Sequence, residues 1–226
     1  MALRELSVRR LGTRDYASVL ALQEELFEAR VEGRVPDTLL LLEHTPVITL
    51  GRGAKREHIL LPDDALARMG VELHEIGRGG DVTYHGPGQL VGYPILDLRP
   101  DRCDVRRYVQ NLEQVMIRLA ALHGVHAQRI DKLNGAWISG SDLGDRKIGA
   151  VGVRISRWVT THGFAFNVNT ALDAFDLIVP CGIRDKQVTS LARELEREIA
   201  MDTITEQALE IFAELFGYEL PSTMPR

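Results

Sequence analysis

Two cysteines, Cys103 and Cys181, are the residues of this chain best suited to covalent chemistry, because a cysteine thiolate is an effective nucleophile. Cys181 follows Pro180 and precedes Gly182 in a predicted turn, which could present the sulfur to a ligand. Many cysteines are instead buried structural residues. Cys103 stands at the predicted start of a helix, a position that favours a thiolate. The residue types alone leave both cysteines open as the nucleophile.

Lys147 is a second candidate for chemistry, since it opens an apolar, glycine-rich strand predicted over residues 147–155. A lysine amine beside a thiol can act as its general base, and its positive charge favours the thiolate. An exposed lysine at the end of a strand is the ordinary alternative. The sequence pattern by itself does not decide between the two interpretations.

Residues 78–89 form the most distinctive stretch, because glycine and proline alternate with side chains that can donate hydrogen bonds. Glycine allows a backbone to approach a ligand closely, and loops with these properties often carry binding sites. We therefore predict one wall of a binding site here. A pair of tight turns between strands is the alternative.

The order of the residues is more specific than their composition, and it resembles the lipoyl(octanoyl) transferases of lipoate biosynthesis. Similar segments follow in the family's order over about residues 35–195: a strand and turn at 43–52, a lysine strand at 147–153, a segment at 161–169 and a cysteine turn at 180–183. The signature itself falls on Arg78-Gly79-Gly80, Thr83, Tyr84, His85, Gly88-Gln89 and Tyr93.

This resemblance implies roles for individual residues. Cys181 would be the acylated residue and Lys147 its partner in a Cys-Lys dyad, whereas Cys103 matches no functional position of the family. Arg78 would contact the ligand or brace the loop, and His85 would position a carbonyl or shuttle a proton, with His162 and Asn167 as supporting residues. The implied substrate-binding residues are Arg78, Gly79, Gly80, Asp81, Val82, Thr83, Tyr84, His85, Ala150, Val151, Gly152, Gly163, Phe164 and Ala165.

The resemblance also implies the reaction. An octanoyl group would pass from octanoyl-acyl carrier protein, through a thioester on Cys181, to a lysine of a lipoyl domain in a 2-oxoacid dehydrogenase subunit or the glycine cleavage H protein. Amide formation from a thioester is downhill, so we expect no ATP and no cofactor. Acyl chain length, the physiological acceptor and the oligomeric state cannot be read from the sequence.

Three other functions compete with this interpretation. An ATP-dependent lipoate or biotin ligase would share the fold, and residues 51–56 faintly resemble the basic loop of biotin ligases. A non-catalytic relative would only bind lipoyl domains or carrier protein, but it would need neither Cys181 nor Lys147. A thiol hydrolase would use Cys181 with His85 or His162, and the sequence leaves some hydrolysis open.

Hydrophobic periodicity predicts an α+β fold. Several neighbouring strands are too close in sequence for a crossover helix, which favours a mixed, largely antiparallel sheet with packed helices. The resemblance implies the catalytic-domain fold of biotin and lipoate protein ligases, as one domain over residues 1–226 with its catalytic region at about 35–217. Helices are predicted at 13–31, 63–69, 104–123, 188–200 and 203–216, and strands at 38–42, 46–51, 71–76, 89–98, 125–130, 136–138, 147–155 and 159–168.

Two of these helices have predicted faces. In the helix at 104–123, Val105, Tyr108, Leu112, Val115, Met116 and Leu119 form the expected buried stripe. In the helix at 13–31, Gln23 is expected on the polar side, opposite Val19 and Leu26.

Bulk composition excludes several classes of function. The net charge of −5 gives no case for nucleic-acid binding. No apolar run approaches the roughly 20 residues of a membrane span and no signal peptide is evident, so we expect a cytoplasmic protein without membrane association. The seven histidines show no metal-ligand spacing, and no metal site is expected. Basic clusters at 52–56 and 102–107 are solvated surface or, in the transferase interpretation, contacts for an acidic carrier protein.

Overall fold

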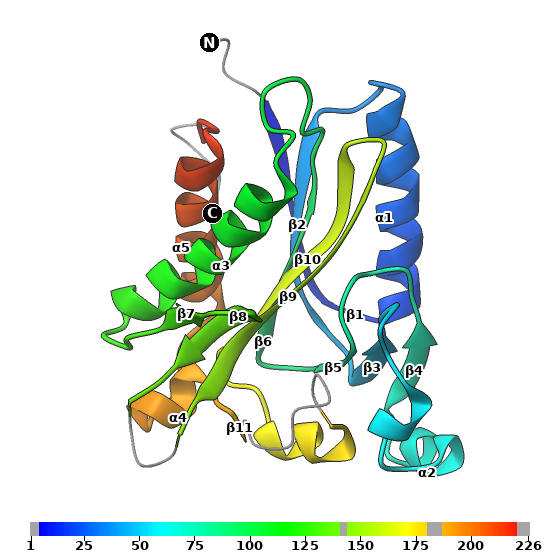
Figure 1. Ribbon diagram of the computed structural model, residues 1–226, viewed down its shortest axis with the longest axis vertical. Coiled ribbons are helices and arrows are strands. Elements are labelled where there is room, and N and C mark those ends of the chain that lie inside the picture. The colour runs from blue at the N-terminus through cyan, green and yellow to red at the C-terminus, as the bar shows by residue number, and fades with distance from the viewer. Residues whose placement is uncertain (1–4, 141–143, 180–186, 221–226) are drawn as a thin grey trace.

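The computed structural model describes residues 5–140, 144–179 and 187–220, and they form two β-sheets with helices packed around them (Figure 1). Most neighbouring strands are antiparallel, while β1–β2, β3–β4 and β9–β11 are parallel. The main sheet has the order β1 (Leu6–Arg14), β2 (Asp37–His44), β6 (Gln89–Ile95), β10 (Val159–Asn167), β9 (Arg146–Ser156), β8 (Leu133–Ile138) and β7 (Gln128–Ile130), with β11 (Gln187–Val188) beside β9. The smaller sheet has the order β4 (Glu72–Glu75), β3 (Val47–Leu50) and β5 (Val82–His85).

Helices cover both faces of the main sheet. On one face, α3 (Val105–Leu122) and α5 (Met201–Phe216) bury apolar side chains against Phe164 and Phe166 of β10. On the other face, α1 (Tyr16–Val31) packs against β2, β6 and Ala165 of β10 (Figure 1). Phe164 and Ala165 thus face opposite sides of the sheet, as the alternation along a strand requires. The remaining helices are short: α2 (Asp63–Arg68), α4 (Leu191–Leu195), and the 3-10 turns η1 (Arg56–His58) and η2 (Leu172–Leu177).

Local sequence explains where the long helices begin and end. The side chain of Asp15 accepts a hydrogen bond from the Ser18 N–H and caps α1, and Asp104 caps α3 through the Arg107 N–H in the same way. Gly217 ends α5 with φ +70°, a left-handed conformation that glycine adopts without steric cost.

The predicted α+β class and its antiparallel character are confirmed, but several local predictions are wrong. Strands β1 and β5 were not predicted, and the helix expected over 188–200 is only the five-residue α4, which Ser190 caps and which ends at Glu196 with φ +53°. Val105 is 46% exposed because it begins α3 beyond the edge of the core. Gln23 is buried, because it hydrogen-bonds to β10.

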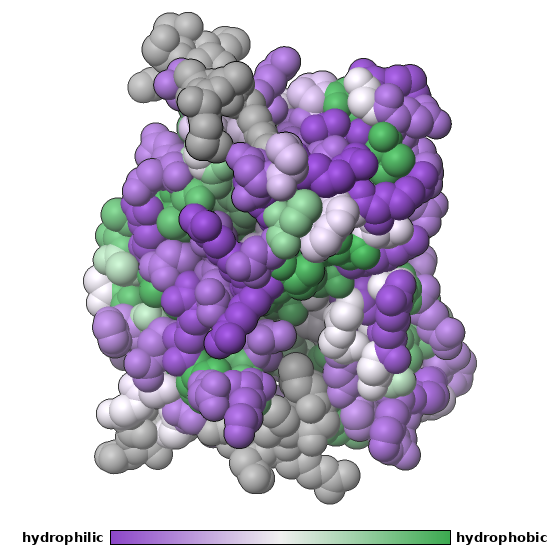
Figure 2. All heavy atoms as spheres, turned by 45° about the horizontal axis from the view of Figure 1, so that its top comes forward, coloured by the Kyte–Doolittle hydropathy of each residue, from purple (hydrophilic) through white to green (hydrophobic). Residues whose placement is uncertain are grey.

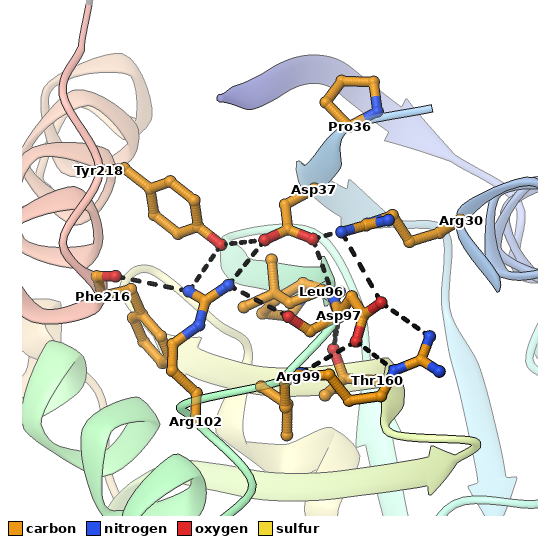
Figure 3. Close-up of polar contacts among 12 residues, drawn as sticks. Arg30, Pro36, Asp37, Leu96, Asp97, Arg99, Arg102, Thr160, Phe216 and Tyr218 are labelled. Atoms are coloured by element: carbon orange, nitrogen blue, oxygen red, sulfur yellow. Dashed lines mark hydrogen bonds and ion pairs between the residues drawn. The ribbon is translucent and has the colours of Figure 1, made fainter. Parts of the chain in front are cut away.

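A buried polar network ties the beginning of β2 to distant parts of the chain (Figure 3). The carboxylate of Asp37 pairs with Arg30 Nε at 2.7 Å and Arg102 Nη2 at 2.8 Å, and it accepts a hydrogen bond from the Tyr218 hydroxyl at 2.6 Å. Arg102, which the sequence placed in a surface cluster, is therefore largely committed to an internal ion pair.

The face of the molecule drawn in Figure 2 is mostly hydrophilic, with apolar side chains gathered near its middle. Within the described ranges, no helix has both the length and the apolar character needed to cross a bilayer.

Candidate active site

A cavity of about 370 Å³ lies between the glycine-rich loop and the main sheet, which is a typical volume for a small-molecule site. Residues from the loop, β5, β6, β9 and β10 contribute to it. Its described lining comprises Tyr16, Arg78, Gly80, Asp81, Val82, Thr83, His85, Gln89, Tyr93, Lys132, Leu133, Asn134, Lys147, Gly149, Ala150, Val151, Gly152, His162, Gly163, Phe164, Ala165, Asn167, Phe175 and Val188. Three segments that are far apart in sequence, and that the resemblance implied as substrate contacts, thus meet at one cavity.

Arg78 braces the loop and also lines the cavity. Its guanidinium donates to the carbonyl oxygen of Thr49 at 2.8 Å, to the Thr49 hydroxyl at 2.9 Å and to the Gly79 carbonyl at 3.1 Å. The loop backbone also packs closely on β3, because a Cβ at Gly51 would overlap the carbonyl oxygen of Gly80. These contacts hold the loop in one place over the sheet.

Small residues form the floor of the cavity. Ala150 pairs with Ala165 and Gly152 with Gly163 across β9 and β10. Val151 lies between Ala150 and Gly152 on β9, and its side chain packs in the core beneath α3 and α5. Because side chains alternate along a strand, Ala150 and Gly152 face the cavity. A floor without bulky side chains leaves room for a chain-like ligand to lie against the backbone.

Lys147 lies at one end of this floor. It lines the cavity, its cross-strand partner is Trp137, and its Nζ lies 4.6 Å from the centre of the Trp137 ring, a cation–π contact. On its other side, Lys147 pairs with Val188 of β11. Its amine is therefore fixed at that end of the cavity.

The predicted nucleophile, Cys181, lies outside the described residues. Phe175 precedes Cys181 in the sequence and Val188 follows it, and both of these described residues line the cavity. The competing cysteine, Cys103, is exposed, its thiol donates to the Leu98 carbonyl at 3.4 Å, and it is not among the lining residues. The role of Cys181 remains a prediction.

His85 is held by a chain of side-chain hydrogen bonds. Its Nδ1 lies 2.7 Å from Gln89 Oε1, and Gln89 Nε2 donates to Asn167 Oδ1 at 2.9 Å. Asn167 in turn donates to the Thr189 carbonyl at 2.9 Å. Burial, together with neighbouring His44, lowers the pKa of His85 to about 3, so the imidazole is neutral near pH 7. With Nδ1–H donating to Gln89, the other ring nitrogen is an acceptor, which suits positioning of a substrate group.

Two implied contact residues do not line the cavity. The Gly79 N–H donates to the Val153 carbonyl at 2.9 Å, which joins the loop to β9. Tyr84 is buried on the opposite side of β5, where its ring packs edge-on against Phe175 at 5.6 Å. Strand alternation explains this: Thr83 and His85 face one side of β5, and Tyr84 faces the other.

The cavity also contains residues that were not among the implied catalytic and substrate-binding residues: Tyr16, Gln89, Tyr93, Lys132, Leu133, Asn134, Gly149, Phe175 and Val188, together with His162 and Asn167, which the sequence implied only as supporting residues. Four of these residues lie within the family motifs named above: Gln89, Tyr93, His162 and Asn167. Their places in those motifs could have identified them as cavity residues. Lys132 comes from the β7–β8 turn and its neighbours Leu133 and Asn134 from the start of β8, and no local pattern indicates that this segment approaches the cavity. Those parts of the chain that the structure describes contain no group of three or more His, Cys, Asp or Glu side chains placed to hold a metal ion.

The fold is that of a known class of enzymes. The chain is similar to a bipartite lipoate protein ligase from Thermoplasma acidophilum, solved in work that included its E2 lipoyl domain, with a TM-score of 0.71 and 17% sequence identity. That match covers 97% of this chain and 87% of the ligase chain. The predicted biotin and lipoate protein ligase fold is therefore confirmed.

Sequence comparison places the chain within this class. The family described as "Lipoyl protein ligase A/B catalytic domain" matches residues 15–213, and the chain belongs to it. An octanoyltransferase of Myxococcus xanthus is 52% identical over 221 residues, covering 97% of this chain and 62% of that protein. An octanoyltransferase of Acidobacterium capsulatum is 49% identical over 225 residues, covering 95% of this chain and 92% of that protein. As predicted, the chain is an acyltransferase.

Proposed function

We propose that this acyltransferase moves an octanoyl group from octanoyl-acyl carrier protein to a lysine side chain of a lipoyl domain, in lipoate biosynthesis. Octanoyltransferases that are about half identical over nearly the whole chain support the acyl group. The observation that carries the proposal is that Lys147 lines the same cavity as Phe175 and Val188, which precede and follow Cys181 in sequence. Lipoyl domains as acceptors agree with the E2 lipoyl domain studied alongside the Thermoplasma ligase.

The reaction has two steps, with Cys181 as the nucleophile. The Cys181 thiolate attacks the thioester carbonyl of the donor, a new carbon–sulfur bond forms, and the carrier leaves as a thiolate that takes up a proton. The amine of the acceptor lysine then attacks the acyl-enzyme, its proton passes to a base, and the Cys181 sulfur is released as an amide forms. No ATP enters either step.

Lys147 is the proposed base in both steps. Its amine can take the Cys181 proton and return it to the carrier thiolate, and later accept the proton of the incoming amine. The small-residue floor would hold the acyl chain. His85 would position the carbonyl through its unprotonated ring nitrogen, and backbone N–H groups of the glycine-rich loop are candidates to stabilise the negatively charged oxygen.

Mass spectrometry of the intact protein tests the acyl-enzyme. Incubated with octanoyl-acyl carrier protein alone, the protein is expected to gain one octanoyl group, which hydroxylamine removes because thioesters are labile to it. Cys181→Ser is expected to lose this adduct, whereas Cys103→Ser is a matched control that keeps it. An adduct that persists in Cys181→Ser, or that is absent from the unaltered chain, would refute the thioester mechanism.

Lys147→Met tests the base. Loss of a general base typically lowers the rate by about 10²–10⁴-fold, and we expect a decrease of this size in both acylation and transfer. If ATP and free octanoate instead support acceptor modification with release of pyrophosphate, the ligase interpretation is correct. If acylated protein forms but water is the main acceptor, the chain is a hydrolase.

A further inference from the structure

A second, smaller chamber lies directly behind one residue of the active-site cavity. It has a volume of about 140 Å³, and His162 lines both spaces, so this side chain forms a wall between them. The chamber is bordered by α1, the end of β4 and neighbouring positions of β9 and β10, and it opens toward the surface beside the exposed residues Glu24 and Glu75. Its lining comprises Leu20, Gln23, Glu24, Phe27, Glu75, Ile76, Gly77, Arg154, Thr161 and His162.

His162 lies at the opposite end of the cavity from Lys147. It pairs with Val153, six positions along β9 from Lys147, a distance of roughly 20 Å at about 3.3 Å per residue. The lysine stem and the imidazole occupy part of that span. The seven carbon–carbon bonds of an octanoyl chain extend about 8 Å, at roughly 1.2 Å per bond. An octanoyl chain that starts beside Lys147 and lies along the floor therefore extends toward His162.

The backbone holds this wall in an unusual conformation. His162 has φ +55°, in the left-handed region that side chains other than glycine seldom adopt, and it interrupts the regular alternation of β10. Its N–H donates to the buried Gln23 side-chain oxygen at 2.9 Å. A strained conformation persists only where the surroundings enforce it, and it often marks a functional position.

The chamber behind the wall is polar. Among residues placed by the structure, Gln23 Nε2, Thr161 Oγ1 and His162 Nδ1 are buried and have no hydrogen-bond partner, and all three residues line the chamber. Such groups are normally satisfied by enclosed water. An apolar tail that entered would separate them from water without replacing its hydrogen bonds, which is unfavourable. Burial lowers the pKa of His162 to about 4, with Arg78 and Arg154 adding to the effect, so the wall itself is neutral.

We propose that His162, with the polar chamber of Gln23 and Thr161 behind it, is the end wall of the acyl site and limits the length of the transferred chain. The inference rests on the acyl transfer proposed above and assigns a specificity-determining residue to that reaction. His162 blocks a longer chain sterically, and the chamber opposes it by desolvation.

His162→Gly is the decisive variant, because glycine removes the side chain and suits a positive φ. With octanoyl- and decanoyl-acyl carrier proteins, the decanoyl-to-octanoyl ratio of kcat/KM is expected to rise by up to about fifteenfold. Two further buried methylene groups each contribute roughly fourfold. His162→Asn keeps a smaller side chain that tolerates this φ, and a rise of about fourfold is expected. It also serves if the glycine variant does not fold.

A refilling variant separates the chamber from other effects of losing the imidazole. Gly77 lines the chamber, and a Cβ there would meet only Arg154, with its nearest atom at 3.6 Å. Adding Gly77→Leu to His162→Gly is expected to restore the octanoyl preference. Gly77→Leu alone is expected to leave octanoyl transfer unchanged.

Binding of free fatty acids provides a readout that does not depend on transfer. Calorimetry is expected to show that His162→Gly raises the affinity for decanoate relative to that for octanoate. Adding Gly77→Leu is expected to reverse this change. An unaltered chain that transfers octanoyl groups, together with a His162→Gly variant of unchanged preference in both assays, would overturn the end-wall inference alone. If the unaltered chain transfers no acyl group, the proposed function fails, and the binding series still decides the role of His162.

Discussion

Three buried histidines make the stability of this protein dependent on pH. Burial is the main cause that lowers the pKa of His44 to about 4, of His85 to about 3 and of His162 to about 4. Partners alter these values: the Arg14 carbonyl, Asp15 and Glu72 raise that of His44, and Arg78 lowers those of His85 and His162. All three imidazoles are neutral in the folded protein at pH 7, whereas an unfolded histidine has a pKa of about 6.5.

The direction in which stability changes with pH follows from proton uptake by the unfolded state. Since the unfolded state binds protons first, stability is complete above about pH 7 and decreases as the pH falls through 6.5 toward the folded pKa values. By linkage, each buried histidine lowers the free energy of unfolding by about 0.8 kcal/mol at pH 6 and by about 2 kcal/mol at pH 5, relative to pH 8. Together the three cost roughly 6 kcal/mol at pH 5, a large part of the 5–15 kcal/mol by which a typical domain is stable.

Urea unfolding at pH 8, 6 and 5 measures this directly as the free energy of unfolding at each pH. His85→Gln is expected to lose about a third of the pH dependence, whatever its effect on stability at pH 8. His126→Gln, which alters an exposed histidine, is the matched control and is expected to retain the full dependence. Equal stability at pH 8 and pH 5 would refute the assignment of buried neutral histidines.

Two further substitutions test the packing. Asp37→Asn removes one member of the buried network of Figure 3 and leaves Arg30 and Arg102 without their shared carboxylate, so a loss of about 3–5 kcal/mol is expected in urea unfolding. Arg68→Ala breaks an exposed pair with Asp64 and should change little; equal losses for the two would contradict the argument. Gly163→Ala would force a methyl group into the carbonyl oxygen of Gly92, so the melting temperature should fall by an amount equivalent to about 1–3 kcal/mol or more. An unchanged melting temperature would show that the two strands can separate without cost.

Much of the fold could be predicted from local patterns. The helices α3 and α5 combine strong periodicity with recognisable ends, such as Asp104 and Gly217. The errors occur where tertiary contacts decide. Strand β1 is largely exposed, so it has no clear alternation, and it is defined by its pairing with β2. Gln23 lies in the interior because β10 presents an N–H at His162, which no pattern within α1 indicates.

The site was predictable to the extent that it lies in contiguous motifs. The glycine-rich loop, the lysine strand and the segment at 161–169 meet at the cavity, as the resemblance implied. Tyr84 and Gly79 show the limit, since a motif does not reveal which of its residues face a ligand and which support the backbone. Tyr16 and Lys132 reach the cavity only through the packing of α1 and the β7–β8 turn.

The packing of the floor explains why selectivity for chain length would reside at the end wall. Gly163 has no space for a larger residue, because Gly92 lies against it. At Gly152, a Cβ would lie 3.0 Å from Arg78 Cδ, so the floor and the loop constrain each other. Because both glycines already have no side chain, no single substitution there can widen the site. His162 is different: it is a large side chain with open volume on both sides, so its removal lengthens the site without disturbing the sheet pairing that positions Lys147.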